Sequence, residues 1–190
     1  MKKGERTKQR ITEAARGLFA ERGFTAITMK DVCISAEISR GGLYAYFSSP
    51  ADILEEIIRL EQEKAYAALN EAIKGNISPY SIIRGFLSVR AEEISNTSRS
   101  ISGAINQFAR SGERGQAIVK KRALDAVKIL TGMIRLGQEQ GIFRGGDPEE
   151  YACGILWLTE GMNAHAELLG ISPEKARKQL FLSVDMLKTD

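Results

Sequence analysis

The sequence is poor in the residues on which most enzyme chemistry depends. It has one histidine and two cysteines, Cys33 and Cys153, which are far apart in the chain. These residues give neither a catalytic triad nor a set of metal ligands. We therefore expect no enzymatic activity, no cofactor and no metal site. Two isolated cysteines are typical of free thiols, which indicates a reducing, cytoplasmic setting.

Long apolar segments are also missing. No run of eighteen apolar residues is present, so we expect no membrane-spanning helix. The beginning of the chain, MKKGERTKQRIT, is basic but leads into no apolar segment, which argues against a secretory signal. The glycine pair at 41–42 lacks the GxxxxGKS pattern that would make it a phosphate-binding loop.

Proline is scarce, and each proline follows a residue that can cap a helix. A Ser or Asp side chain accepts a hydrogen bond from a free amide of the first helical turn, and proline suits the next position because it has no amide to lose. The four sites therefore predict four helix starts: Ser49-Pro50, Ser78-Pro79, Asp147-Pro148 and Ser172-Pro173.

The remaining pattern is helical throughout. Apolar residues recur at helical spacing from Ile11 to Phe19, and Gly23 ends that helix. No strand alternation, internal repeat or low-complexity segment is present. We predict an all-α fold of about nine helices. After the first, these cover 28–36, 39–47, 50–74, 79–95, 99–110, 114–140, 148–169 and 173–188.

Charge is unevenly distributed along the chain. Residues 1–50 hold nine Lys or Arg and five Asp or Glu, a net charge of +4, whereas the other 140 residues have a net charge of −1. A basic excess confined to one segment favours an anionic partner, nucleic acid first, although a solvated basic face would give the same count.

Two short helices at 28–36 and 39–47 form a predicted helix-turn-helix, the motif that places its second helix in the DNA major groove. Leu43 and Phe47 should face the core. Arg40 can pair with guanine or phosphate, and Ala45 with a thymine methyl. Gly41 and Gly42, costly inside a helix, would let the backbone approach DNA.

Residues 7–60 resemble the DNA-binding domain of the TetR family of transcriptional regulators. The segments that match are RITEAARGLFAERGFTAITMKDV, AEISRGGLYAYF and SSPADILEEII. The resemblance implies a helix-turn-helix domain over 1–48 and a helical effector-binding and dimerisation domain over 49–190. By position it implies nine DNA-contacting residues: Thr28, Lys30, Ser39, Arg40, Gly41, Gly42, Tyr44, Ala45 and Tyr46.

Three residues depart from the family pattern. Glu37 occupies a turn position where glycine is usual, so a positive φ there would cost about 1–2 kcal/mol. Gly42 replaces the usual Thr, Ser or Ala and removes a possible base contact. Pro50 replaces a frequent lysine and removes a possible phosphate contact.

The helix predicted at 148–169 is apolar on nearly every side and should be buried all round. With the apolar stripe of 173–188, it favours a homodimer interface over an ordinary monomeric core. The resemblance also implies a small-molecule effector. Its candidate contacts are polar or aromatic residues in apolar helices: Arg90, Asn106, Gln107, Phe108, Trp157, Glu160 and His165.

Each of these residues also has a structural interpretation. Trp157 suits a core and His165 a hydrogen-bonded interface, while Glu160 needs either a cationic ligand or a partner such as Arg90. We expect a cytoplasmic, operator-binding repressor that an effector releases. The alternatives are a helical ligand- or partner-binding protein that no longer uses DNA, and an architectural DNA-binding protein, which the modest total charge disfavours.

Overall fold

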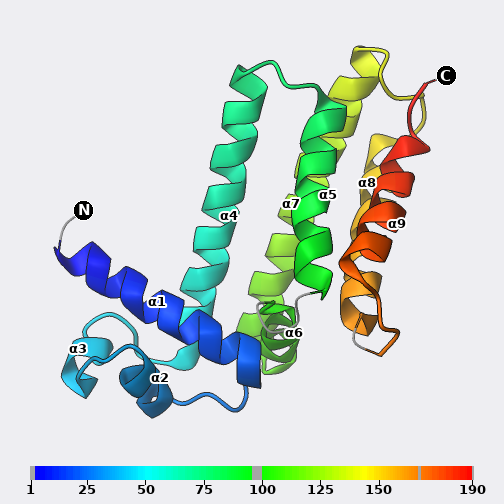
Figure 1. Cartoon of the computed structure of the whole chain (residues 1–190). Coiled ribbons are helices and arrows are strands. Elements are labelled where there is room, and N and C mark those ends of the chain that lie inside the picture. The colour runs from blue at the N-terminus through cyan, green and yellow to red at the C-terminus, as the bar shows by residue number, and fades with distance from the viewer. Residues whose placement is uncertain (1–2, 96–99, 167, 190) are drawn as a thin grey trace. The chain divides into compact units, whose positions relative to one another are not determined.

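The structure, a computed structural model, describes residues 3–95, 100–166 and 168–189, and within these ranges the chain is all-α, as predicted (Figure 1). The described residues form nine helices: α1 (Lys3–Arg22), α2 (Met29–Ser35), α3 (Arg40–Tyr44), α4 (Pro50–Lys74), α5 (Pro79–Ser95), α6 (Ser102–Arg110), α7 (Glu113–Glu139), α8 (Pro148–His165) and α9 (Pro173–Asp185).

All four helix starts predicted from proline are confirmed, since α4, α5, α8 and α9 begin at the four prolines. The preceding side chain caps each of them. Ser49 Oγ accepts from the Asp52 amide at 3.2 Å, and Asp147 Oδ1 accepts from the Glu149 amide at 2.9 Å. The hydroxyls of the serines before Pro79 and Pro173 accept equivalent bonds. Gly23 ends α1 with a φ of 75°, which glycine adopts at little cost.

Several helix boundaries differ from the predicted ones. α8 ends at His165 instead of 169, and α9 at Asp185 instead of 188. The helix α3 is shorter than predicted and ends at Tyr44. Beyond it the chain forms turns, in which the Tyr46 and Phe47 amides both donate to the Leu43 carbonyl. The predicted start of α6 at residue 99 lies outside the described residues.

By packing, the chain divides into two compact units. The first comprises Met1–Ala65 and Ser98–Lys120, and the second comprises Tyr66–Thr97 and Lys121–Asp190. This division does not follow the predicted boundary between residues 48 and 49. The N-terminal half of α4 and all of α6 pack with the helix-turn-helix instead of with the C-terminal helices.

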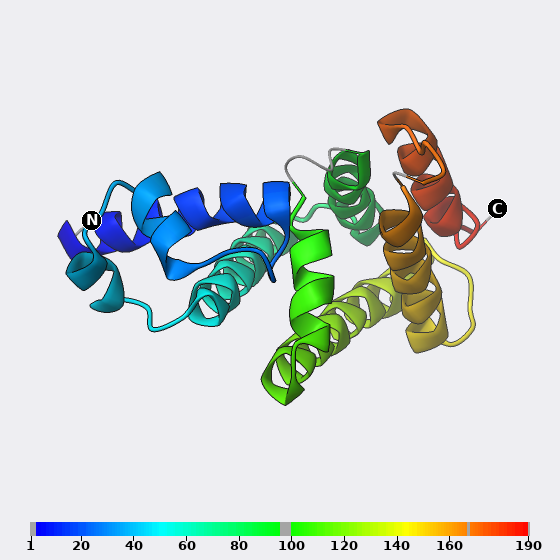
Figure 2. The same ribbon diagram turned by 90° about the horizontal axis from the view of Figure 1, so that it is seen from below.

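The first unit has a continuous apolar core. Ile11 and Phe19 of α1, Val32 of α2 and Leu43 of α3 are all almost completely buried in it. α6 adds Ala104, Ile105 and Phe108 to the same core. Figure 2 shows α6 at the C-terminal end of α1, against which it packs.

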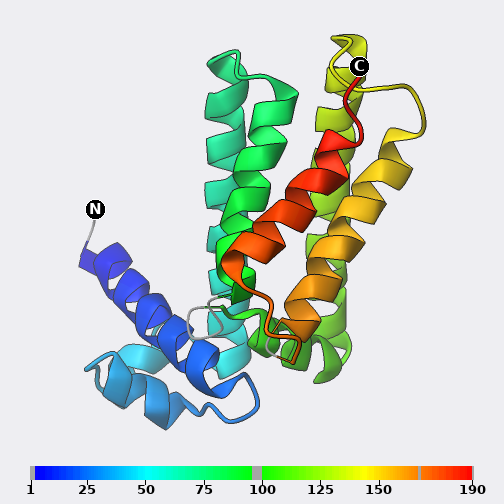
Figure 3. The same ribbon diagram turned by 45° about the vertical axis from the view of Figure 1, so that its right-hand side comes forward.

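The second unit is organised around α5, α8 and α9, which pack against one another (Figure 3). Leu87 of α5 and Leu180 of α9 are fully buried between them. α8 buries only one side, through Ala152, Ile155 and Thr159. The prediction that this helix is buried all round is therefore wrong for the single chain, in which Trp157 is 68% exposed. Among the described helices, none combines the length and the apolar character needed to cross a bilayer.

Candidate nucleic-acid interface

Local hydrogen bonds define the start of α2. Thr28 is its N-cap. The Asp31 amide donates to the Thr28 hydroxyl at 3.3 Å, and the Thr28 amide donates to the Asp31 carboxylate at 2.9 Å, which together form a reciprocal capping box. The hydrogen bonds from Thr28 hold the pKa of Asp31 below its usual range, so this cap persists at neutral pH. The exposed Thr28 side chain therefore lies at the positive end of a helix.

The turn between α2 and α3 contains a strained residue. Glu37 has a φ of 50°, the left-handed conformation that only glycine adopts without steric cost. The structure thereby answers the question that the sequence left open, because the turn has the shape for which glycine is suited. The Ile38 amide donates to the Cys33 carbonyl at 3.0 Å and closes the turn over this residue.

We expect Glu37→Gly to raise the free energy of unfolding by about 1 kcal/mol, since it removes the left-handed strain of a residue with a Cβ atom. Urea unfolding followed by circular dichroism measures the change. Glu37→Ala is the matched control, because it removes the carboxylate and keeps the Cβ atom. Equal stabilisation by both variants would attribute the gain to charge instead of to backbone conformation.

The two glycines of α3 have different surroundings. A Cβ atom on Gly41 would meet nothing within 4 Å, and Gly41 is exposed. A Cβ atom on Gly42 would lie 2.9 Å from Cγ1 of Ile38, so the packing of the turn itself favours glycine there. Gly41 therefore leaves the backbone open for a close approach to DNA. At Gly42, the contact with Ile38 is an additional, structural reason for glycine.

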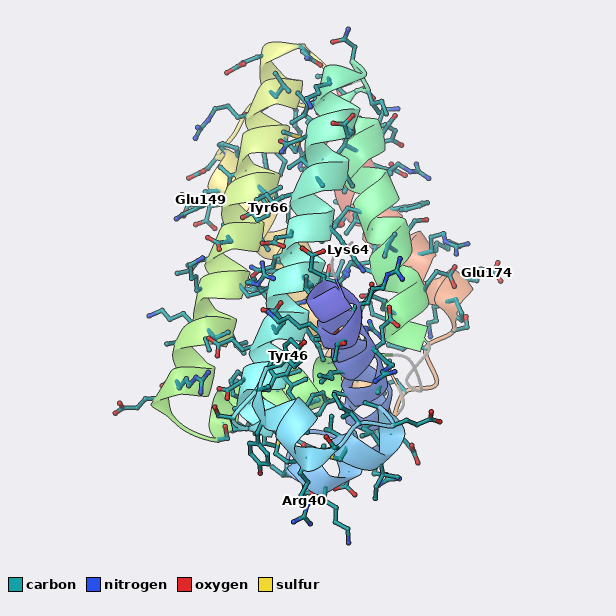
Figure 4. The ribbon with its side chains drawn as sticks, turned by 90° about the vertical axis from the view of Figure 1, so that its left-hand side faces the viewer. Arg40, Tyr46, Lys64, Tyr66, Glu149 and Glu174 are labelled. Carbon is teal, nitrogen blue, oxygen red and sulfur yellow. The ribbon has the colours of Figure 1, made fainter. Side chains whose placement is uncertain are left out.

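All but one of the predicted DNA-facing residues are exposed. Leu43 and Phe47 are buried in the core, as predicted from their spacing. Of the nine candidate DNA contacts, Gly42 is half-buried and the other eight are exposed: Thr28, Lys30, Ser39, Arg40, Gly41, Tyr44, Ala45 and Tyr46. Figure 4 shows the Arg40 side chain extending from the tip of this unit into solvent.

The cations of this unit differ in their pairing. Lys8 lies 2.7 Å from Glu56, and Arg16 and Arg22 lie within 4.0 Å of carboxylates. Within the described part of the chain, neither Lys30 nor Arg40 forms an ion pair. Their charges are therefore available to phosphate or to base edges, whereas the other three stabilise the unit itself.

The first turn of α4 is acidic and paired. Asp52 accepts the Ser48 amide at 3.0 Å, and Arg114 donates to Asp52 at 2.8 Å and also to Glu55. Burial raises the pKa of Asp52, but hydrogen bonds from Arg114, Ser49 and Ser48 lower it further, so the net shift is downward. Pro50 adds no cation at the start of α4. The carboxylates of its first turn bind groups of the protein itself.

The seven candidate effector residues are divided between the two units. Asn106, Gln107 and Phe108 belong to the first, and Phe108 is buried in its core. In the second, the possible Glu160–Arg90 pair is absent, because Glu160 is exposed and Arg90 bonds to Glu93 at 2.9 Å. Trp157 and His165 are exposed, and His165 Nδ1 lies 2.9 Å from the Gly161 carbonyl oxygen.

Two positions contact the segments that flank the helix-turn-helix in a way that the sequence does not predict. Gln107 was chosen as an effector contact, yet its side chain bonds to the backbone amides of Phe24 and Thr25. Arg114, which the sequence did not single out, reaches the start of α4. The sequence indicates only that Gln107 lies on the polar face of an amphipathic helix, which does not identify the groups to which it bonds.

Comparison with known proteins identifies this architecture. The family profile described as "Bacterial regulatory proteins, tetR family" matches residues 11–57, the segment that spans α1 to the first half of α4. The HTH-type transcriptional regulator UidR of Escherichia coli K12 is 29% identical over 135 residues, which cover 71% of this chain and 68% of that protein. Residues 11–57 are therefore a TetR-type DNA-binding segment, and the matches support a transcriptional regulator of the TetR family.

Two further proteins are similar to this chain, one in sequence and one in fold. The HTH-type transcriptional repressor KstR2 of Mycobacterium tuberculosis H37Rv is 24% identical over 135 residues, which cover 70% of this chain and 68% of that protein. A solved transcriptional regulator from Saccharomonospora viridis, in complex with choline, superposes with a TM-score of 0.81 at 18% identity, covering 98% of this chain and 100% of that one. The chain is a DNA-binding regulator and not an enzyme.

Proposed function

We propose that this TetR-family protein represses transcription by binding a specific operator through α2 and α3. The observation that supports this most directly is that Lys30, Arg40, Tyr44 and Tyr46 are all exposed, and that the two cations have no ion-pair partner among the described residues. Arg40 suits bidentate recognition of guanine, and the tyrosine hydroxyls suit phosphate oxygens, which set the register on the duplex. The remaining candidate contacts, Thr28, Ser39, Gly41, Gly42 and Ala45, complete the proposed surface.

The proposed working form is a cytoplasmic homodimer. Helix-turn-helix dimers read two half-sites about 34 Å apart, one helical turn of DNA. α8 and α9 expose the large apolar side chains Trp157, Leu182 and Met186, and Leu168 and Leu169 are exposed between the two helices. A second copy that covers these residues would remove apolar surface from water and so stabilise the pair.

The proposed release mechanism is a small-molecule effector that favours a dimer with the wrong spacing between its recognition helices. Choline in the Saccharomonospora regulator supports a small-molecule role for this fold. An effector lowers DNA affinity by its differential binding to the two states, typically 1–3 kcal/mol. Isothermal titration with and without operator tests this, because equal effector affinity in both would exclude the coupling.

Operator recognition is tested by selecting duplexes from a random-sequence library with the purified protein. Fluorescence anisotropy at about 150 mM salt should then show a preference of about a thousandfold or more over a scrambled duplex. Equal, weak and strongly salt-dependent binding to both duplexes would indicate non-specific attachment instead. Absence of DNA binding by a folded protein would favour a ligand-binding role without DNA.

We expect Arg40→Ala to weaken binding of the selected duplex about 5- to 150-fold, the loss of about 1–3 kcal/mol that accompanies removal of one bidentate base contact. Anisotropy titrations against duplexes substituted at each position measure it. If Arg40 reads a base, discrimination at one position also disappears. Arg135→Ala removes an exposed arginine from the second unit and serves as the control. An equal loss in both variants would contradict a specific role for Arg40.

A further inference from the structure

The turn between α1 and α2 is held by a side chain that comes from far along the chain. Gln107 Oε1 accepts hydrogen bonds from the backbone amides of Phe24 at 2.7 Å and Thr25 at 3.1 Å. Gln107 lies on α6, more than eighty residues after this turn. One acceptor atom therefore fixes two consecutive peptide units of the turn.

The backbone of the turn is shaped to admit this side chain. A Cβ atom on Gly23 would lie 2.6 Å from Gln107 Oε1, closer than any real contact allows. The Gly23 amide still donates to the Phe19 carbonyl of α1 at 3.0 Å, and its φ of 75° then turns the chain away from the helical path. The absence of a side chain at Gly23 leaves the space that Gln107 occupies, so the two residues fit each other.

The position of this turn determines where α2 begins. Only Ala26 and the buried Ile27 separate Thr25 from Thr28, the N-cap of α2. The rings of Phe24 and Phe108 lie next to each other, with centroids 5.1 Å apart, so α6 supports the turn by packing as well as by hydrogen bonding. Figures 1 and 2 both show α6 beside the end of α1 that leads into this turn.

The same stretch of chain also reaches the other end of the helix-turn-helix. Arg114, in the first turn of α7, donates to Asp52 at 2.8 Å and to Glu55. Asp52 in turn accepts the amide of Ser48, the residue that follows the buried Phe47 after α3. Residues 107–114 therefore contact the chain both before α2 and after α3.

We propose that Gln107 is a positioning residue for DNA binding, which orients α2 and α3 by holding the Phe24–Thr25 turn, and that Arg114 does the same at the start of α4. This inference rests on the proposed operator binding. It assigns to Gln107 no contact with DNA or with an effector. The exposed position of the turn means that water can replace the lost bonds, so removal of the acceptor should alter orientation more than overall stability.

Three variants test the proposal. Gln107→Leu removes the acceptor at similar size, Gln107→Glu keeps an oxygen in its place, and Asn106→Leu changes an exposed neighbour on the same helix. The free proteins are compared by hydrogen exchange of the Phe24 and Thr25 amides, and then by anisotropy with a duplex that the wild type has selected. We expect Gln107→Leu to accelerate hydrogen exchange at both amides and to lower the affinity for the duplex about tenfold. The salt dependence of binding should be unchanged.

Gln107→Glu and Asn106→Leu should match the wild type in both measurements. Three outcomes would each overturn the positioning role. Amide exchange could be unchanged in Gln107→Leu, or its duplex affinity could stay within about twofold of wild type despite faster exchange. Gln107→Glu could also behave like Gln107→Leu. A library from which the wild type enriches no duplex would overturn operator recognition itself, and with it any role of Gln107 there. Amide exchange is measured without DNA, so it tests the role of Gln107 in the turn even if operator recognition fails.

Discussion

Phe108→Ala should lower the free energy of unfolding of the DNA-binding unit by about 3–5 kcal/mol, although residue 108 is far from the helix-turn-helix in sequence. The Phe108 side chain is 2% exposed and belongs to the same core as Phe19 and Leu43. Truncation removes its apolar contacts, leaves a cavity and deletes the ring pair with Phe24.

The measurement is hydrogen exchange at increasing urea concentration, which reports each unit by its own amides. Amides of α1 to α3 should lose protection in Phe108→Ala, and operator binding should fall with them. Phe181→Ala is the control, because Phe181 packs in the core of the second unit and its loss should affect amides there. Unchanged protection of α1 to α3 in Phe108→Ala would contradict the assignment of α6 to the DNA-binding unit.

Features set by a few neighbouring residues could be predicted from the sequence. The caps before Pro50, Pro79, Pro148 and Pro173 involve atoms within three residues of each other, so their outcome depends little on the rest of the fold. The burial of Leu43 and Phe47 followed in the same way from helical spacing. These local features were enough to identify the helix-turn-helix and its exposed face.

The sequence identified Glu37 as an unusual residue for its turn, but it could not predict whether Glu37 has a positive φ. Whether a turn adopts a positive φ depends on how the helices on both sides pack, and a glutamate at that position argues weakly against it. In the structure the packing of α2 and α3 determines the turn, and Glu37 adopts the strained conformation. The neighbouring Gly42 has a packing reason, contact with Ile38, that spacing along one helix does not reveal.

Long-range side-chain pairing was the least accessible feature. Gln107 bonds to residues more than eighty positions earlier, and Arg114 bonds to Asp52 across 62 positions. Helical periodicity says which face of α6 is apolar, but not which backbone amides lie opposite its polar side chains. For the same reason, Glu160 was considered as a partner of Arg90, whereas in the structure it is exposed and Arg90 pairs locally with Glu93.

The exposed tryptophan of α8 leads to the largest expected effect on assembly. Trp157 is 68% exposed, Leu182 on α9 is 50% exposed, and Met186, directly after α9, is 60% exposed. A large apolar side chain in water is unfavourable, and tryptophan is prominent among the residues that dominate interfaces. In a two-fold symmetric dimer every residue occurs twice, so one substitution removes two such contacts.

Trp157→Glu should therefore raise the dimer dissociation constant about a thousandfold, corresponding to about 2 kcal/mol from each protomer. Sedimentation velocity over a range of concentrations measures it, and operator affinity should fall because a monomer reaches one half-site only. Leu124→Glu is the control, since it places the same charge on another exposed apolar residue, Leu124 of α7, which is 50% exposed. An undiminished dimer in Trp157→Glu, together with dissociation in Leu124→Glu, would move the interface from α8 and α9 to α7.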